Sequence, residues 1–304
     1  NDVLIGGAGN DTFNANSGSD TLYGWGGNDT FNITNKSGSY TDVIDGGDGT
    51  NVLSISYSGI TKMSDFASIS APTDSNGSIV FTDSNGGSIS AKNILTWTGE
   101  MKWDGYITVN SKTYRFVSDY RSEKYPWEGA YGSVYAFIYE NGSNVEVVVP
   151  VDGLFNPNYR MSSYRDFSLD GSETYTITGS SGSEILKGGY QADIINAGDG
   201  DDAIAGGDGA DTINAGAGND VVYLTKSALT EDASIDGGTG SDTLSFFNIG
   251  TWDNETYAAV TFNLANDLGN ATNFENIAGS SYADTLTGNN AANVIIGAGN
   301  GDTL

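Results

Sequence analysis

The sequence predicts an all-β protein: a parallel β-roll interrupted by an inserted antiparallel β domain. Acidic and aliphatic residues recur with a period of nine in separate parts of the chain, and glycine pairs lie between them. Both features are absent from the middle of the chain, and no segment shows a sustained helical period. We therefore expect repeat blocks at 1–53, 179–246 and 279–304, the insert at 54–178 and a bridging segment at 247–278.

The most regular repeats lie between residues 188 and 222. A large aliphatic residue follows each Asp by two positions, as in Gly206-Gly207-Asp208-Gly209-Ala210-Asp211-Thr212-Ile213-Asn214. The Asp-x-aliphatic part can form a short strand, and the glycines accept positive φ in a tight turn. Two repeats then make one coil, so Asp residues eighteen apart stack on the same edge. Asp202 and Asp220 share one edge, and Asp193 and Asp211 share the other.

Stacked carboxylates require a cation between them. At a rung spacing of roughly 4.8 Å, two bare carboxylates repel by about 3 to 4 kcal/mol at an effective dielectric near 20. Carboxylates and turn carbonyls supply only hard oxygen ligands, which suit Ca²⁺ rather than zinc or copper. The candidate metal-site residues are the edge carboxylates and the turn glycines, namely Asp11, Asp20, Asp29, Asp42, Asp193, Asp202, Asp211, Asp220, Asp242, Gly7, Gly9, Gly27, Gly200, Gly207, Gly209, Gly218 and Gly240.

Composition narrows the classes of function. Thirty-nine Asp and Glu against twelve Lys and Arg give a net charge of -27, which argues against nucleic acid and an anionic membrane surface as partners. The chain has no Cys and no His, which removes thiol nucleophiles, Cys or His zinc sites and Ser-His triads. No run approaches the eighteen apolar residues of a membrane-spanning helix. Calcium is the partner that fits this composition.

The consensus Gly-Gly-x-Gly-x-Asp-x-U-x, with U a large aliphatic residue, resembles the repeat-in-toxin (RTX) family of secreted calcium-binding proteins. This resemblance covers about half of the chain. It implies several bound calcium ions, secretion through a type I exporter and a location outside the cell or on a bacterial cell surface. RTX segments also accompany proteases, lipases and cytolysins. No such catalytic motif occurs in this sequence, so we expect no enzyme.

The repeat blocks share one irregularity. The period slips by four residues between Asp29 and Asp42, and the same slip precedes Asp242 in the later block. Both copies contain Ile-Asp-Gly-Gly-x-Gly, with an offset of 191 residues, so the chain holds two versions of one module. In the block 279–304 the turns lack the fourth-position glycine. We expect the aliphatic ladder to persist there better than the metal sites.

The insert has a different composition. Turn signals predict hairpins around Asp83-Ser84-Asn85-Gly86, between 106 and 117, and around Asn141-Gly142-Ser143. Eight of the twelve basic residues lie between Lys92 and Arg165. The aromatic side chains either pack in the hairpins or form a platform for a carbohydrate. The stretch 119–128 has no alternation that would bury its rings, and its candidate recognition residues are Tyr120, Arg121, Tyr125 and Trp127.

The sequence therefore favours a non-enzymatic, calcium-stabilised extracellular surface protein, such as an S-layer subunit, a filament or an adhesin segment, that folds on binding Ca²⁺. The alternative is a carbohydrate-binding module that recognises a surface glycan, or an accessory part of a secreted polysaccharide-active enzyme. In the second case Asp119, Glu123 and Glu128 could supply a carboxylate pair, although nothing fixes their spacing. The chain starts and stops within a repeat, so we expect a matured chain or an excerpt. We expect the roll ends to contact neighbouring repeats or a second copy of the chain.

Overall fold

The computed structural model describes residues 1–72, 77–99, 102–124, 131–141, 144–150, 154–155, 172–224, 228–247, 259–299 and 301–304, with the backbone alone at 97–99, 102–104, 117–124, 131–135 and 154–155. The chain divides into two compact units. The first unit comprises Asn1–Arg121, Ser133–Tyr139 and Val148–Val151, and the second comprises Ser122–Gly132, Glu140–Val147 and Asp152–Leu304. No helix among the described residues is long and apolar enough to span a membrane.

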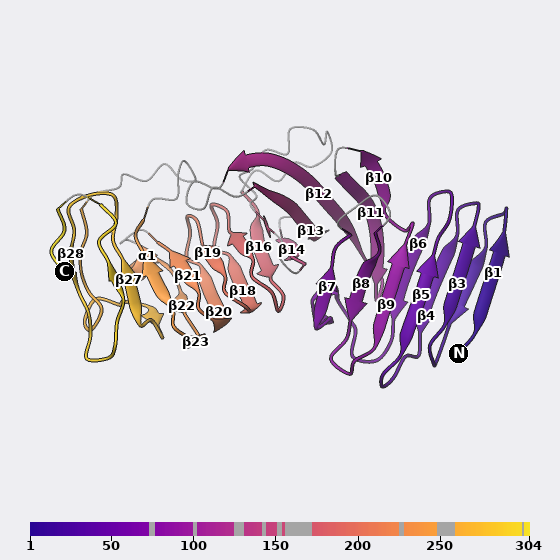
Figure 1. The fold of residues 1–304 in the computed structure, drawn as a ribbon, viewed down its shortest axis with the longest axis horizontal. Coiled ribbons are helices and arrows are strands. Elements are labelled where there is room, and N and C mark those ends of the chain that lie inside the picture. Colours follow the sequence, from indigo (N-terminus) through magenta and orange to yellow (C-terminus); the bar gives the residue numbers. More distant parts are fainter. Residues whose placement is uncertain are drawn as a thin grey trace. The chain divides into compact units, whose positions relative to one another are not determined.

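The first unit begins with a parallel β-roll (Figure 1). Strands alternate between two sheets, and each strand pairs in parallel with the strand one coil later. One sheet contains β1 (Val3–Gly7), β3 (Thr21–Trp25) and β5 (Thr41–Asp45), and the other contains β2 (Thr12–Ala15), β4 (Thr30–Thr34) and β6 (Val52–Ser56). The register is eighteen residues in regular coils, as in Leu4 opposite Leu22, and twenty-two where the period slips, as in Leu22 opposite Ile44. The structure thus confirms the parallel roll.

The core of the first roll follows from the alternation of buried and exposed side chains along each strand. Large apolar residues point inward from both sheets, and Leu22, Phe31 and Leu53 are fully buried. The rings of Phe13 and Phe31 stack with their centroids 4.8 Å apart. Because each side chain packs on its equivalent in the next coil, one repeated position builds a continuous apolar column.

The hairpins of the insert continue the sheets of the first roll. β9 (Ser88–Lys92) pairs in parallel with β5, and β11 (Lys102–Val109) pairs in parallel with β6. β8 (Ile79–Thr82) is antiparallel to β7 (Ser68–Ser70) and to β9, while β12 (Lys112–Lys124) is antiparallel to β11. The hairpins expected at Asp83–Gly86 and at 106–117 are confirmed. The remaining elements of the insert are η1 (Met63–Asp65), β10 (Thr96–Gly99), β13 (Tyr131–Asn141), β14 (Asn144–Val148) and β15 (Leu154–Phe155).

The second unit contains another parallel roll. One sheet contains β16 (Thr174–Thr178), β18 (Ile194–Asp199), β20 (Thr212–Gly218), β22 (Ser234–Asp236), β23 (Thr239–Gly240) and β26 (Ala271–Thr272). The other contains β17 (Ile185–Lys187), β19 (Ala203–Ala205), β21 (Val221–Tyr223), β24 (Thr243–Ser245), β27 (Asn276–Ala278) and β29 (Ile295–Ile296). The short helix α1 (Ala228–Glu231) lies in the slip after β21, and β25 (Thr261–Asn263) pairs with β28 (Thr285–Thr287). Ile277 lies opposite Ile295, so the aliphatic ladder continues into the degenerate block, as expected.

Candidate metal centres

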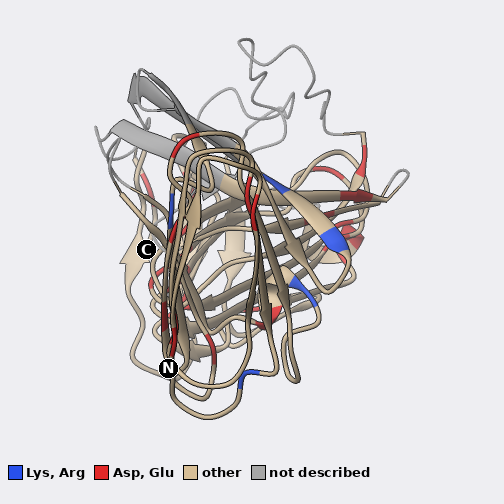
Figure 2. Ribbon diagram, turned by 90° about the vertical axis from the view of Figure 1, so that its right-hand side faces the viewer, with Lys and Arg blue, Asp and Glu red and all other residues tan. Residues whose placement is uncertain are grey.

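The repeat carboxylates lie where each turn enters the next strand. Most of them are buried: Asp20, Asp29, Asp42, Asp193, Asp202, Asp211, Asp220 and Asp242 are at most 2% exposed, whereas Asp11 is half-buried. Figure 2 marks the acidic residues in red and the few basic residues in blue. Buried carboxylates at this density need hydrogen bonds or cations, because ionised groups are stable inside a protein only when they are paired.

One oxygen of each carboxylate is used by the fold. The backbone N–H of Asp202 donates to Oδ1 of Asp220 over 2.8 Å, and the N–H of Asp193 donates to Oδ1 of Asp211 over 2.8 Å. The same bond spans the slip, where the N–H of Asp220 donates to Oδ1 of Asp242 over 2.9 Å. Each carboxylate is therefore fixed by the backbone of the preceding coil, and the fold aligns the edge carboxylates in a column.

The second oxygen is often left without a partner. Among the described residues, Oδ2 is buried without a hydrogen bond in Asp29, Asp42, Asp202, Asp211, Asp220 and Asp242, and of these only that of Asp42 lies beside an ammonium, Nζ of Lys36 at 2.8 Å. A buried charged oxygen without a partner costs several kcal/mol, on the order of the penalty for an unpaired buried ion. Apart from Asp42, these oxygens lie on both edges of the second roll and on one edge of the first. They are the strongest indication that a cation belongs between the coils.

The turn glycines allow backbone carbonyl oxygens to lie close to the repeat carboxylates. Gly209 has φ of +116°, and a Cβ there would lie 2.5 Å from the carbonyl of Gln191, one coil earlier. At Gly188, the space that a Cβ would fill lies 2.5 Å from Oδ2 of Asp193 and against the carbonyl oxygen of Gly206. Only glycine permits this approach of carbonyl and carboxylate oxygens.

The donor set fits Ca²⁺. In the part of the chain that the structure describes, no three acidic side chains converge on one point, so an ion at an edge would take carboxylate oxygens together with several backbone carbonyls. Calcium accepts six to eight oxygen ligands in flexible geometry, and carbonyls are among them.

Burial changes the acidity of these carboxylates in the absence of a metal. It raises the pKa of Asp202 to about 8, that of Asp211 to about 7 and those of Asp193 and Asp220 to about 6, against the opposing effect of the backbone hydrogen bonds. Neighbouring carboxylates add to the rise at Asp202 and Asp211. Near neutral pH, the fold therefore holds protons or a metal ion at these positions more readily than bare charge.

Two of the expected ligands have a different partner. The ammonium of Lys36 lies 2.9 Å from Oδ2 of Asp20 and 2.8 Å from Oδ2 of Asp42. Burial raises the pKa of Asp20, but hydrogen bonds from Lys36 and from the backbone of Asp2 outweigh it, and the pKa is lowered overall. Burial also raises the pKa of Asp42, opposed by the same ammonium. Because Nζ lies so close to both groups, we assign both carboxylates as ionised.

Several residues at the edges were not among the sequence candidates. Glu184 and Asp232 are at most 2% exposed and occupy edge positions, where Glu184 N–H donates to Asp202 and Asp232 Oδ1 accepts from Asp211 N–H over 3.2 Å. Glu184 lies nine residues before Asp193, so the period could have identified it. Asp232 lies one residue before the expected position, and the slip concealed it.

Among the described residues of the degenerate block, no carboxylate oxygen is buried without a hydrogen bond. Both oxygens of Asp284 accept hydrogen bonds, Oδ1 from Val260 N–H and the Ser280 hydroxyl, and Oδ2 from Ser280 N–H. Of the recognition candidates, Tyr120 and Arg121 belong to β12, whose described part gives only their backbone, and Tyr125 and Trp127 lie outside the described residues.

The fold and these edges define a parallel β-roll that presents oxygen donors between its coils. A family model, the RTX calcium-binding nonapeptide repeat (4 copies), matches residues 1–31, 37–54, 178–213, 198–225 and 272–304. The chain therefore carries RTX calcium-binding repeats in both units. Proteins with these repeats are typically secreted.

Other comparisons add little. No curated protein matches the sequence significantly. The crystal structure of the extracellular lipase LipA from Serratia marcescens is similar at 15% identity, over 95% of this chain and 33% of the lipase chain, with a TM-score of 0.27. This chain thus spans about a third of that lipase, and a likeness of this strength carries no argument about function.

Proposed function

We propose that this chain is a non-enzymatic, calcium-stabilised part of an extracellular surface protein, and that its rolls fold when they meet calcium outside the cell. The observation that supports this most directly is the set of buried Oδ2 atoms without partners in the second roll. Without a cation, the buried charges of the carboxylate column destabilise the folded roll. With a cation bound between them, the same carboxylates hold consecutive coils together.

The roles of the residues follow from their contacts. Oδ1 of Asp220 keeps its hydrogen bond to the preceding coil, which leaves Oδ2 for the ion. The turn glycines, such as Gly200 and Gly218, let the carbonyl oxygen of the preceding coil lie in the space that a side chain would fill. Bound calcium supplies the positive charge that neutralises this edge. Extracellular calcium sites have Kd values of roughly 10⁻⁴ to 10⁻³ M, so the calcium level outside a cell would drive folding.

Hydrogen exchange on the full chain tests the proposal. In millimolar calcium, amides of 194–223 should be protected, and excess chelator should remove that protection. Unchanged protection of 194–223 in chelator would refute calcium-coupled folding. Circular dichroism on the same samples reports whether β structure is lost as a whole.

A role in surface assembly is supported by apolar side chains on the outer face of the first roll. β1, β3 and β5 expose an outward row there, with Val3 at 67%, Ile5 at 63% and Trp25 at 66% exposure. Exposed apolar patches typically mark contacts with another protein. We propose that a second copy of the chain covers this row once calcium has reduced the repulsion between the acidic molecules.

Light scattering against calcium concentration tests the assembly. Calcium should raise the molecular mass of the wild type, and Val3→Ser with Ile5→Ser should prevent the rise. Ile194→Ser, which changes a 45% exposed side chain of the second unit, serves as the control. A monomer at high protein concentration and millimolar calcium would exclude self-association.

A further inference from the structure

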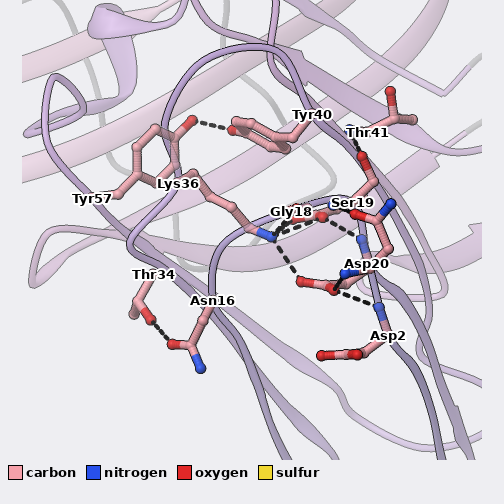
Figure 3. Close-up of polar contacts among 12 residues, drawn as sticks. Asp2, Asn16, Gly18, Ser19, Asp20, Thr34, Lys36, Tyr40, Thr41 and Tyr57 are labelled. Carbon is pink, nitrogen blue, oxygen red and sulfur yellow. Dashed lines mark hydrogen bonds and ion pairs between the residues drawn. The ribbon is translucent and has the colours of Figure 1, made fainter.

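Lys36 is the only basic residue in the first repeat block, residues 1–53. Its side chain is fully buried, which is rare for lysine unless the ammonium is paired. Nζ donates hydrogen bonds of 2.9 Å each to the carbonyl oxygen of Gly18 and to Oδ2 of Asp20 (Figure 3). It donates a third, also of 2.9 Å, to Oδ1 of Asp42. The ring of Tyr40 lies 5.2 Å from Nζ and covers it further.

The ammonium lies where a cation between two consecutive coils of the roll would be expected. Asp20 and Asp42 occupy the same repeat position in consecutive coils, and the N–H of Asp20 donates to Oδ1 of Asp42 over 2.9 Å. This is the arrangement that joins Asp220 to Asp242 in the second roll. There Oδ2 of both residues lacks a hydrogen bond. Here Oδ2 of Asp42 lacks one as well, but Nζ of Lys36 lies within 2.9 Å of Oδ2 of both carboxylates.

The local sequence explains why this edge differs. The turn before Asp20 reads Ala15-Asn16-Ser17-Gly18, so the glycine pair that opens the regular turns is missing. Ala15 stands in place of the first glycine of that pair and is buried. Lys36 itself belongs to the four-residue slip between Asp29 and Asp42. The extra residues place a cation at the edge whose turn lacks the glycine pair but keeps Gly18.

The opposite edge of the same roll provides the contrast. Its turns keep the glycine pattern, as in Gly6-Gly7-Ala8-Gly9, and Oδ2 of Asp29 is buried without a hydrogen-bond partner. At the end of that edge Asn51 replaces the carboxylate, and its amide donates to the carbonyl of Asn93 over 2.9 Å. In the second module the segment that corresponds in sequence to the one bearing Lys36 includes 225–227, which lie outside the described residues.

We propose that the Lys36 ammonium replaces calcium between Asp20 and Asp42, so that this edge of the first roll folds without the metal and becomes a calcium site when the ammonium is removed. The inference rests on the proposed calcium binding at the other edges. A lysine carries three donors and one positive charge, and unlike a bound ion it cannot be removed by a chelator. The strands on either side, β3 and β5, are thereby joined permanently.

The test compares the full-length wild type with Lys36→Met, which keeps the length of the side chain and removes its charge. Lys62→Met, at an exposed lysine of the same unit, is the matched control. Hydrogen exchange is followed in 19–45 and in 194–223, with millimolar calcium and with excess chelator. Calorimetric titration on the same proteins counts the bound ions.

In chelator, wild type and Lys62→Met should keep protection in 19–45 while losing it in 194–223. Lys36→Met should lose protection in 19–45 in chelator, regain it in calcium and bind one additional ion per chain. Equal calcium dependence of both segments in the wild type would overturn the inference but leave calcium-coupled folding intact. Calcium independence of 194–223 would instead refute the proposed function.

If Lys36→Met fails to fold, a second variant shows the reason. If Lys36→Met is unprotected in 19–45 even with calcium, the triple variant Asp20→Asn, Lys36→Met, Asp42→Asn removes the charges together. Recovery of protection without an added calcium ion would show that uncompensated charge had unfolded the segment, as the inference requires. Failure to recover would show that Lys36 acts through packing alone, and the inference would be wrong.

Discussion

The backbone N–H of Asp202 donates a hydrogen bond of 2.8 Å to Oδ1 of Asp220, eighteen residues later. One oxygen of Asp220 thus holds two coils together, and the other is buried without a hydrogen bond. In this assignment one oxygen of the carboxylate stabilises the fold and the other binds the ion. Substitutions at single residues can test the two roles separately.

Asp220→Asn should weaken calcium-induced folding by about tenfold in calcium midpoint, which is about 1.4 kcal/mol. The amide oxygen can still accept the bond from Asp202, but the charge that attracts the ion is lost. Asp284→Asn is the matched control because both oxygens of Asp284 already accept hydrogen bonds. Circular dichroism during calcium titration measures the midpoints. Equal shifts for the two variants would contradict the assignment of Asp220 as a ligand.

Gly209→Ala should destabilise the calcium-loaded second unit by about 1–3 kcal/mol, the usual cost of a side chain in a strained backbone conformation. The new methyl group would meet the backbone of Gln191 at 2.5 Å, and φ at this position is +116°. Gly9→Ala occupies the same repeat position in the first roll but meets nothing within 4 Å. Its effect should stay within about 0.5 kcal/mol. Denaturant unfolding in saturating calcium compares the two, and similar losses would disprove the clash.

Acid should partly replace calcium in the second unit. The pKa values of Asp202 and Asp211 are raised to about 8 and about 7 in the metal-free fold, above the value of roughly 3.9 for an unfolded Asp. The folded state therefore binds protons more tightly, and its proton-linked stability is greatest below about pH 4 and is lost as pH rises toward 8.

Thermal unfolding of calcium-stripped protein at pH 5 and pH 8 measures this effect, and the higher melting temperature should occur at pH 5. Calcium binding must displace the same protons, so calcium affinity should change in the opposite direction and rise from pH 5 to pH 8. A metal-free protein that is more stable at pH 8 would show that these carboxylates are ionised in the fold without assistance.

Much of the architecture could be predicted because the repeat is strict. A period of nine with Ile195, Ile204 and Ile213 fixes which side chains point inward, and the observed register of eighteen follows from it. The parallel pairing of β9 and β11 with the first roll could not be predicted. Those strands lack the nonapeptide, and their pairing depends on contacts between residues far apart in sequence.

The candidate sites were predicted less completely. Sequence spacing located the carboxylate columns but did not show how each oxygen is used. Lys36 was overlooked because it lies within the slip, where the period gives no register. A single basic residue in an acidic block was the available signal, and its partners became visible only when the coils were stacked.

The stretch 119–128, which includes the end of β12, remains the expected site of recognition. Tyr125→Ala with Trp127→Ala should reduce binding of the chain to a surface glycan while calcium-induced folding is unchanged, because aromatic side chains contribute strongly to contact surfaces. Glycan-array binding and calcium titration are measured on the same preparation. Loss of folding in the double variant would instead favour packing of these rings in the core.

The eighteen-residue coil also determines how the molecule would respond to pulling. A folded coil advances the roll by one strand spacing, about 4.8 Å, whereas its eighteen residues extend to roughly 60 Å when stretched. Each coil that detaches would thus lengthen the chain about twelvefold over its folded rise. The calcium-bound edges would resist this extension only while the ion is present, whereas the Lys36 linkage would resist it at any calcium concentration. The protein would then behave as a tether whose resistance to stretching depends on the surrounding calcium. The Lys36 linkage would be the one connection whose resistance does not depend on calcium.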